Sequence, residues 1–595
     1  MHVRTNRLKD GRTAMAFCEN YRDGKKTRTR TVERIGCVED FPELDDPVAH
    51  FKQVARERTA AAREGSTVTV ELHMAQKVDK RDGGQRRCAG AAVACAAYNA
   101  LGVERALRNS SRGSGAGYDL NAAMRLFVVE RLVDPGSKLS AWENRERHFF
   151  RSELSERDCY RALDGIAAAK PAVLGAVNRA VAAMGGRDTS CLYYDVTNYH
   201  FETEGDGDEL RRRGCAKNHM PKPIVQMGLV QDAEGIPVGY RLFPGNTVDC
   251  ETMLPVYGDV RAMAGGGRVV SVADKGNNTS TNMALLVAAG DGFVFSQSIR
   301  GTKSKASMRE WAVSEEGYRV TASDKATGEP LFKVKSRQDS KTIHLKAGDT
   351  ADGRPADVPV EVKVVAFWSR KYERKARAER AKVLEKARRL VESPGAYSAA
   401  THKGAARWVK DVSFDKESGE VVTGKSSEID WEAVAEAEKC DGYYVIVTSE
   451  TDWDEDRIID TYRELWRIEE SFKVTKSELR ARPVFVWTPE HIEAHFLICF
   501  VALTVTRLLQ RALGYRWSCE EILDDMAATC MTKLVSNIWV SDHRTDLTDE
   551  LFALMGSPAP LKQMRLKDVK ALFAKSVEID LRRKSPRKKK SAKKR

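Results

Sequence analysis

Three acidic side chains occur where a carboxylate is unusual, and two of them lie in apolar runs. Asp195 interrupts the aromatic run CLYYDVTNYHFE, and Asp274 closes the run VVSVAD. A buried unpaired charge costs several kcal/mol, so each aspartate needs an Arg, backbone N–H groups or a metal ion as partner. Taken singly, each is more simply explained as a turn or cap residue, and it is their order along the chain, strand-Asp, hairpin, strand-Asp, insertion and helix-Glu, that favours a shared site.

The third acid lies in the stretch DTYRELWRIEESFKVTKSEL, where we expect one helix over residues 458–479. At about 100° per residue, the apolar side chains of this helix form one stripe. That stripe contains Leu465, Ile468, Phe472 and Leu479. Tyr462, Glu469 and Lys476 recur every seven residues and form a polar stripe at its margin. Glu470 points away from the core and is predicted to be a solvated surface residue.

Trp466 falls on the outer side of the predicted helix, beside Glu469. An exposed tryptophan is costly unless something stacks on it. A nucleic-acid base and another domain of this chain are both candidates.

Two acids on neighbouring strands and a third on a helix make an oxygen-rich cluster suited to Mg²⁺ or Mn²⁺. Two such ions about 4 Å apart can activate a water or a 3′-hydroxyl and stabilise the leaving oxygen of a phosphodiester. Asp195, Asp274 and Glu469 are therefore predicted to be catalytic residues and metal ligands.

The elements that must position these residues indicate a multidomain chain. The run CLYYDVTNYHFE alternates as a strand, with Tyr193, Asp195 and Thr197 on one face. The segment PIVQMGLVQDAEGIPVGYRLFPG reads as a β-hairpin around DAEG. A later helix is expected to begin with Thr488 as N-cap and Pro489 at its first position.

Changes in pattern along the chain divide it into six predicted segments. These are 1–80, a basic β-rich segment with a linker helix; 81–186, an α-helical domain; 187–299, the first part of an α/β core; 300–440, a β-rich insertion; 441–545, the second part of the core; and 546–595, C-terminal helices with a basic tail.

Composition favours a polyanionic partner, most commonly nucleic acid. The 595 residues carry a formal net charge of +13, and ten basic residues without an acid follow from Arg582 on. For the tail alone, a solubilising role is an equal alternative. The twelve cysteines form no CxxC pair, which argues against a zinc ribbon or a disulfide framework. The longest apolar run, 496–505, is too short to span a bilayer, so we expect a cytoplasmic protein with no membrane partner.

As a set, these motifs resemble those of the DDE transposases of bacterial insertion sequences, which have an RNase H-like core. The chain is most similar to the IS-four superfamily, whose mark is Tyr-x2-Arg-x3-Glu-x6-Lys, and YRELWRIEESFKVTK supplies its Tyr, Glu and Lys. Leu465 stands at the Arg position, with Arg463 and Arg467 as possible replacements. YYDVTNYHFE matches the first-Asp motif, and VVSVADKGNN the second, where Lys275 replaces a more usual Arg.

The resemblance implies cut-and-paste DNA transposition with two divalent ions, Mg²⁺ or Mn²⁺. It implies an RNase H-like core formed by 187–299 and 441–545, and a DNA-binding or dimerisation role for 81–186. Expected partners are double-stranded DNA, as terminal inverted repeats and target, and a second copy of the chain in a homodimer. The expected location is the nucleoid.

Residue by residue, the resemblance implies DNA contacts around the helix acid. Tyr462 and Lys476 would contact phosphate near the cut, and Trp466 would stack on a flipped base if cleavage passes through a DNA hairpin. Lys473 and Lys275 complete the expected DNA-binding set.

Other candidate sites and functions have less support. His491 and His495 have the spacing of a zinc pair but lack a third ligand, so helix packing is the simpler interpretation. Cys215 and His219 lack partners, and residues 157–181 fit a helix-turn-helix or generic packing equally. An inactive DNA-binding relative and an RNase H-like nuclease without strand transfer remain alternatives. A two-carboxylate glycosidase does not fit the positive charge or the lysines beside the glutamate.

Overall fold

The computed structural model describes residues 1–595 with several gaps. The gaps are 24–25, 65–85, 113–116, 203–206, 215–221, 262–266, 301–305, 351–352, 393–403, 406, 411–427, 535–536, 575–578 and 583–595. The basic tail beyond Arg582 and the pair Cys215 and His219 therefore lie outside the described residues. The chain divides into two compact units, Met1–Asp79 and Lys80–Arg595.

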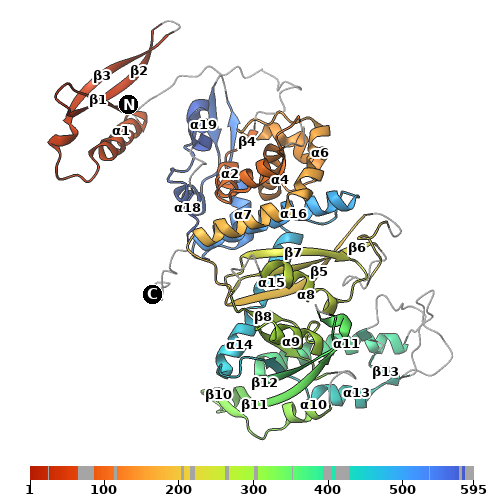
Figure 1. The fold of residues 1–595 in the computed structure, drawn as a ribbon. Coiled ribbons are helices and arrows are strands. Elements are labelled where there is room, and N and C mark those ends of the chain that lie inside the picture. Colours follow the sequence, from red (N-terminus) through yellow and green to blue (C-terminus); the bar gives the residue numbers. More distant parts are fainter. Residues whose placement is uncertain are drawn as a thin grey trace. The chain divides into compact units, whose positions relative to one another are not determined.

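The smaller unit is a three-stranded antiparallel sheet with a helix packed on it (Figure 1). Its elements are β1 (His2–Arg7), β2 (Thr13–Asp23), β3 (Lys26–Cys37), the 3₁₀ turn η1 (Val38–Asp40) and α1 (Pro47–Glu64). Alternation along β2 buries Met15 and Phe17 on one face. Phe51 of α1 meets Phe17 with ring centroids 6.2 Å apart, so these aromatic rings join the helix to the sheet.

The larger unit begins with a mainly helical part, as its apolar periodicity predicts. This part contains β4 (Arg86–Cys88), α2 (Ala91–Ala100), α3 (Val103–Ser110), α4 (Leu120–Val133), α5 (Lys138–Glu143), η2 (Asn144–Arg147), α6 (Glu156–Ala168) and α7 (Lys170–Ala183). Helices α2, α4 and α6 pack around α16 (Pro489–Ala512), which comes from far along the chain. The predicted cap of α16 is confirmed, because the Thr488 side chain accepts a hydrogen bond from the His491 N–H.

Helix α16 is more extensive than the apolar run 496–505 suggests. By length and composition, it is one helix in the described part of the chain that could cross a membrane. However, 94% of its most apolar window is buried inside the protein. A helix that is apolar on all sides is expected in the middle of a large core, and α16 occupies that position.

The central feature of the larger unit is a nine-stranded mixed sheet (Figure 1). Its strands are β5 (Cys191–His200), β6 (Ile224–Gln231), β7 (Pro237–Pro244), β8 (Val270–Ala273), β9 (Gly292–Gln297), β10 (Arg319–Ser323), β11 (Pro330–Leu345), β12 (Ala356–Ser369) and β15 (Tyr443–Thr448). Their order is β10-β11-β12-β15-β9-β8-β5-β6-β7. Strands β5, β8 and β9 run parallel, and the remaining neighbours are antiparallel. The predicted β6–β7 hairpin is present, with Gly235 at φ +79° in its turn.

Helices cover both faces of this sheet, and alternation along the strands assigns side chains to each face. Helices α8 (Met253–Arg261), α9 (Ser280–Ala288) and α10 (Ala306–Val313) contribute to the core on one face. Helices α14 (Glu455–Arg463) and α15 (Trp466–Lys476) contribute to the core on the other. Along β5, Tyr193 and Tyr199 face the α14–α15 side, whereas Leu192 and Val196 face the α8–α9 side. The predicted alternation of this strand is therefore correct.

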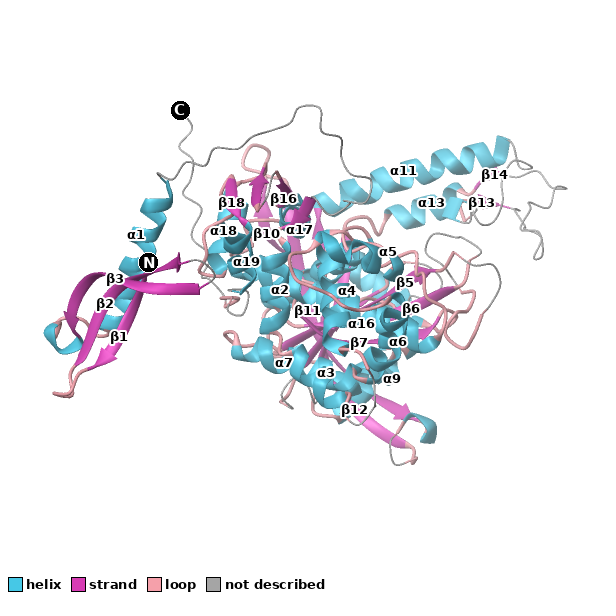
Figure 2. Cartoon of the chain, turned by 90° about the horizontal axis from the view of Figure 1, so that it is seen from above, coloured by secondary structure: helices cyan, strands magenta, loops and turns pink. Residues whose placement is uncertain are grey.

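Residues 300–440 do not form a single separate insertion. Strands β10, β11 and β12 extend the central sheet, because β12 pairs with β15 from Lys363↔Thr448 to Trp368↔Tyr443. The segment that follows β12 projects from the body, as Figure 2 shows. It contains α11 (Arg370–Glu392), β13 (Val409–Lys410), β14 (Glu428–Ile429) and α13 (Trp431–Glu438). This segment has a small core of its own around Trp408.

The C-terminal elements build a second, smaller sheet that includes β4 from the start of the larger unit. They are α17 (Cys519–Ala528), β16 (Cys530–Lys533), β17 (Ile538–Ser541), α18 (Asp546–Leu554), β18 (Gln563–Arg565) and α19 (Leu566–Ala574). The strand order is β18-β17-β16-β4. The two ends of the larger unit are therefore joined by backbone pairing.

The prediction of one continuous helix over residues 458–479 is wrong. The structure has α14 and α15, separated by Glu464 and Leu465. At the break, the N–H groups of Leu465, Arg467 and Ile468 bond carbonyls three residues earlier instead of four. Such a turn contains about 3.0 residues instead of the 3.6 of an α-helix. A single helical wheel therefore does not describe both helices.

Candidate active site

The two strand-borne aspartates lie side by side on the sheet. β5 and β8 are parallel, with Tyr194 opposite Ala273, so the next positions in this register are Asp195 and Asp274. Tyr193 and Val272, two residues before Asp195 and Asp274, both face the α14–α15 side of the sheet. Since alternate residues share a face, the two aspartates are directed to that side as well.

Two contacts align α14 and α15 with β5. The Tyr193 hydroxyl donates a hydrogen bond of 3.0 Å to the Thr461 carbonyl. At the other end, the Lys476 Nζ donates to the Thr197 hydroxyl. Asp195 lies between Tyr193 and Thr197 on the strand, and the helix acid lies midway between Thr461 and Lys476. These contacts therefore place Glu469 over the stretch of β5 that bears Asp195.

Tyr462 links the helix acid to the second aspartate. Burial raises the pKa of this phenol to about 12, a hydrogen bond with Ser296 opposes the rise, and the carboxylates of Asp274 and Glu469 add to it. Both carboxylates must lie near the phenol to act on it electrostatically. Tyr462 is thus positioned between the end of β8 and α15.

The two aspartates have fixed orientations, whereas the glutamate is exposed. Asp195 Oδ1 accepts a 2.8 Å bond from the Val196 N–H, and Asp274 Oδ1 accepts one of the same length from the Gly276 N–H. A Cβ at Gly276 would lie 3.0 Å from Asp274 Oδ1, so a larger residue there would crowd this carboxylate. Asp195 and Asp274 are half-buried, and Glu469 faces solvent.

The ligand types fit a hard divalent cation, because all three side chains offer carboxylate oxygens. Among the described residues, however, no group of three or more His, Cys, Asp or Glu side chains is close enough together to hold an ion. The predicted metal cluster is therefore not assembled in these side-chain positions.

The outward face of α15 carries an exposed stripe at helical spacing. Trp466, Glu469 and Lys473 are exposed, and the intervening apolar residues are buried. Trp466 is 51% exposed, and the Arg467 guanidinium lies 5.7 Å from its ring centroid. Within the described part of the larger unit, domain packing does not cover this tryptophan. Lys275, in the turn after β8, is also exposed.

Leu465, at the position where the superfamily signature has Arg, is buried and belongs to the core. The two arginines considered as replacements have partners of their own. Arg463 pairs with Asp460 at 3.2 Å. Arg467 pairs with Glu464 and donates a 3.2 Å bond to the carbonyl of residue 234. Neither is directed at the carboxylates through these contacts.

The prediction that Glu470 is a solvated surface residue is wrong. Its Oε2 lies 2.8 Å from Arg507 Nη1, and Arg507 on α16 is only 5% exposed. Arg507 also donates to Ser471 Oγ at 2.7 Å and to Gln510 Oε1 at 2.9 Å. Helix α16 covers the side of α15 that an isolated helical wheel leaves open, so Glu470 helps to attach α15. In the sequence, the lone Arg507 inside the apolar run LTVTRLLQ indicated that a buried arginine needs a carboxylate partner.

The two histidines at zinc-pair spacing bind different partners. His491 Nε2 lies 3.2 Å from Asp164 Oδ1, and His495 Nε2 donates a 3.0 Å bond to the Ala481 carbonyl. Burial first, then Lys138, lowers the pKa of His495 well below its ordinary value. These contacts support the packing interpretation.

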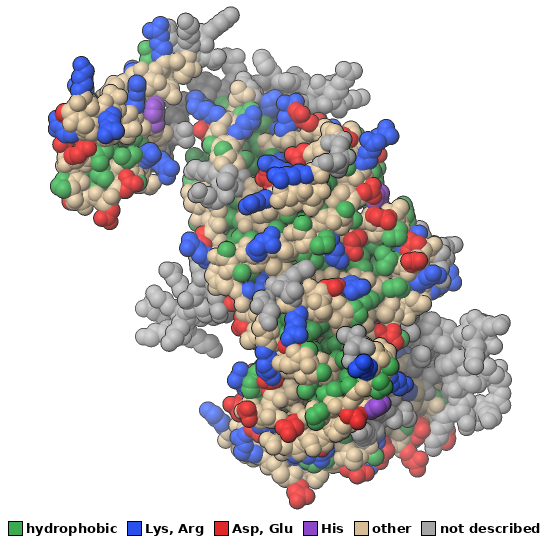
Figure 3. Space-filling view, in the orientation of Figure 1, with side chains coloured by type: hydrophobic (Ala, Val, Ile, Leu, Met, Phe, Trp, Pro, Cys, Tyr) green, Lys and Arg blue, Asp and Glu red, His purple; other side chains and the backbone are tan. Residues whose placement is uncertain are grey.

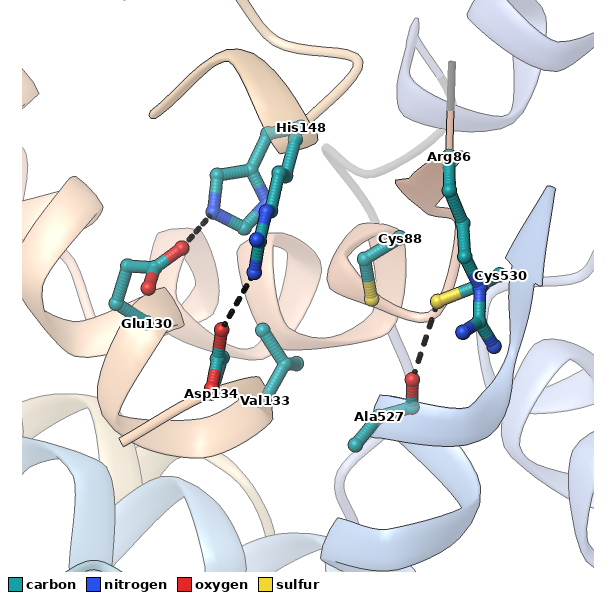
Figure 4. Close-up of a pocket in the computed structure, with 9 residues that line it drawn as sticks. Arg86, Cys88, Glu130, Val133, Asp134, His148, Ala527 and Cys530 are labelled. Carbon is teal, nitrogen blue, oxygen red and sulfur yellow. Dashed lines mark hydrogen bonds and ion pairs between the residues drawn. The ribbon is translucent and has the colours of Figure 1, made fainter. Parts of the chain in front are cut away.

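A cavity of about 410 Å³ lies away from the carboxylates, between the helical part and the smaller C-terminal sheet (Figure 4). It is lined on one side by Glu130 and His148, whose side chains lie 2.5 Å apart and are almost fully buried. On the other side are Cys88 and Cys530, which are directly opposed on paired strands. This cavity contains no residue of the carboxylate site.

Comparisons with known proteins identify the class of the chain. Residues 194–505, more than half of the sequence, match the transposase DDE domain. Residues 2–68 match the N-terminal domain of the IS1634 family transposase. A comparison with curated proteins gives no match. The chain belongs to the DDE insertion-sequence transposases, as its motifs indicate.

Proposed function

We propose that this transposase moves its element by cut-and-paste transposition, with Asp195, Asp274 and Glu469 as catalytic carboxylates. The observation that carries the proposal is the parallel register of β5 and β8, together with the Lys476–Thr197 contact that ties α15 to β5. The strand order β7-β6-β5-β8-β9, with its last three strands parallel, supports an RNase H-like core.

In this proposal, the three carboxylates hold two Mg²⁺ or Mn²⁺ ions. When bound, such ions activate a water or a 3′-hydroxyl and stabilise the leaving oxygen. Asp195 and Asp274 keep a fixed orientation through backbone N–H groups, so each presents its remaining oxygen in a defined direction. Glu469, on the exposed stripe, adjusts its rotamer to complete the ligand set.

The DNA strand is proposed to pass over the exposed face of α15. Lys476 and Tyr462 contact phosphates beside the cut, and Lys473 and Lys275 contribute positive charge on either side. Trp466 stacks on an unpaired base, which its 51% exposure allows.

The proposed partners are the terminal inverted repeats, the target DNA and a second copy of the chain. Residues 81–186 are proposed to bind DNA or the second copy. Among the described side chains on the face in Figure 3, Lys and Arg stand among Asp and Glu and form no separate basic field. We expect DNA affinity to come from local contacts at the site, in a protein located at the nucleoid.

The proposal is tested by incubating the full chain with labelled DNA that contains the element end, with and without Mg²⁺. Nicked, hairpin and strand-transfer products are then separated on a denaturing gel. Glu469→Gln is expected to reduce every product more than a hundredfold while DNA binding persists, since a metal site supplies several kcal/mol of transition-state stabilisation. Glu432→Gln, at an exposed glutamate of α13, is the matched control.

Each result has a defined meaning. Normal cleavage by Glu469→Gln would refute the assignment of the helix acid. Cleavage without joined products would identify a nuclease, and binding without any cleavage by the parent chain would identify an inactive relative.

A further inference from the structure

The segment between α15 and α16 exposes two aromatic rings in a regular pattern. In the sequence VFVW, Val484 and Val486 are buried, whereas Phe485 and Trp487 are 51% and 47% exposed. Burial alternates residue by residue over 484–487, as it does when successive side chains point to opposite sides of a strand. The two aromatic rings are therefore presented on one side of the segment.

The backbone that carries these rings is attached to the core. Val484 pairs with Phe201 just beyond β5, and its N–H donates to the His200 carbonyl at 3.3 Å. Just before it, buried Arg131 donates to the Leu479 carbonyl at 3.0 Å. His495 holds the carbonyl of residue 481 in the same way. Because buried side chains fix this backbone, the exposure of the rings is a property of the fold and not of a loose loop.

Cationic side chains lie beside the two rings. The Arg211 guanidinium is 6.0 Å from the Trp487 ring centroid, and its Nε also pairs with Asp208 at 2.8 Å. The backbone carbonyl of His200 bonds the segment at Val484, and the pKa of this histidine is lowered first by burial and then by the positive charges of Arg482, Lys222 and Lys476, whereas Glu202 raises it. An aromatic surface bordered by cations matches the bases and phosphates of a nucleic-acid strand.

The position of the rings relative to the carboxylates indicates which DNA would reach them. His200 lies five residues beyond Asp195 on β5, or about 17 Å along the strand. Trp466 lies three residues before Glu469, about 4.5 Å back along α15 and away from Lys476, which contacts Thr197 on β5. Trp466 and the Phe485–Trp487 pair therefore lie on opposite sides of the carboxylate site.

We propose that Phe485 and Trp487 form a stacking surface for unpaired nucleobases of the DNA strand that runs past the carboxylates. This inference rests on the proposed function, since it assumes that DNA is bound at that site. The bases must be unpaired, because a duplex hides the faces of its bases except at its ends. The surface would hold unpaired nucleotides on the side of the site toward which β5 runs, about 17 Å along that strand from Asp195.

The test measures binding of the full chain to two labelled probes by fluorescence anisotropy. One is a thymidine oligonucleotide of about 15 nucleotides, within the range that single-strand sites occupy. The other is a duplex of the same length. Divalent ions are omitted, so the result does not depend on cleavage and is read separately from the Glu469→Gln test.

The double substitution Phe485→Ala, Trp487→Ala is expected to weaken binding of the single strand about tenfold or more, since loss of one base–aromatic stack alone weakens binding by about that factor. Duplex binding should change less than about twofold. Trp431→Ala, at a tryptophan that is 57% exposed on α13, is the matched control and should change neither. Phe485→Tyr, Trp487→Phe should restore binding, because both new residues keep a ring.

Three results would overturn the inference. One is equal loss of single-strand and duplex binding in the alanine variant. Another is full single-strand binding by Phe485→Leu, Trp487→Leu, which keeps apolar surface but not the rings. The third is a change in sedimentation with unchanged DNA affinity, which would make the surface an interface between copies. Melting temperatures equal to that of the parent chain exclude misfolding as the cause.

Discussion

The adjacent residues Glu469 and Glu470 allow a sharp test, because substitution of each is expected to impair a different property. Glu469 is exposed, and the structure gives it no role in holding α15 to the core. Glu470 is 30% exposed and pairs with Arg507, whose guanidinium is 5% exposed and also bonds Ser471 and Gln510. Glu469 should therefore serve activity, and Glu470 stability.

The expected free-energy changes follow from these contacts. Glu469→Gln should alter the free energy of unfolding by less than about 0.5 kcal/mol, as surface substitutions usually do. Glu470→Gln keeps an acceptor but loses its charge, which should cost about 1 kcal/mol, the difference between charged and neutral hydrogen bonds. Glu470→Ala leaves the guanidinium of Arg507 without its carboxylate. Breaking a fully buried pair costs about 3–5 kcal/mol, and partial exposure of Glu470 reduces this to about 2–3 kcal/mol.

The assay pairs calorimetric melting with cleavage of end-containing DNA well below the melting temperature. A change of 1 kcal/mol moves the melting temperature by about 2–4 °C in domains of 150–250 residues, and by less in a larger unit. Glu470→Ala should lower it by several degrees and keep measurable cleavage. Glu469→Gln should melt like the parent chain and lose cleavage. If Glu469→Gln destabilises the protein as much as Glu470→Ala does, the division of roles is refuted.

Three further predictions concern buried ionisable groups. Lys138 has its pKa lowered to about 7, first by burial and then by Arg131. Between about pH 7 and the ordinary pKa of 10.5, the unfolded chain binds more protons at Lys138 than the folded chain does, so the stability of the folded protein rises with pH. Lys138→Met removes this group, so it should raise the melting temperature at pH 7 and raise it less near pH 10. The pKa of Cys530 is lowered, first by the opposed thiol of Cys88, so Cys530 should be alkylated by iodoacetamide at a lower pH than an ordinary thiol. Cys88→Ala should move the midpoint of this alkylation upward, and an unchanged midpoint would contradict the assigned cause. Glu130→Ala should lower the free energy of unfolding by about 1–3 kcal/mol, because it leaves the buried His148 Nε2 without its partner. Glu130→Gln keeps an acceptor and should retain much of the stability. Equal melting temperatures of the two variants would contradict this reasoning.

Local patterns predicted local structure correctly. The alternation in β5, the turn of the β6–β7 hairpin and the Thr488 cap depend on residues close together in sequence. The same holds for the exposure of Trp466, which follows from its place on one helical turn. In each case, backbone geometry and a few neighbours decide the outcome.

The sequence failed where distant elements decide the outcome. The helical wheel over 458–479 assumed an unbroken helix, and it could not include α16, which covers Glu470. Similarly, the strand character of 300–370 was recognisable, but its pairing with β15 was not. Strand pairing depends on non-local register, which composition and periodicity do not specify.

The same limit applies to the candidate site, and α16 explains why. From this helix, Arg507 bonds the hydroxyl of Ser471, two residues after the helix acid, and His495 bonds the Ala481 carbonyl before the exposed aromatic segment. One buried helix therefore supports both α15 and the residues that follow it. Arg507 and His495 belong to a long helix in the middle of the larger unit, where the interior is close-packed and yields little. A close-packed interior also transmits the displacement of one element to its neighbours. Substitutions on α16 that shift it should consequently affect Glu469 and the aromatic segment together, although neither is part of that helix.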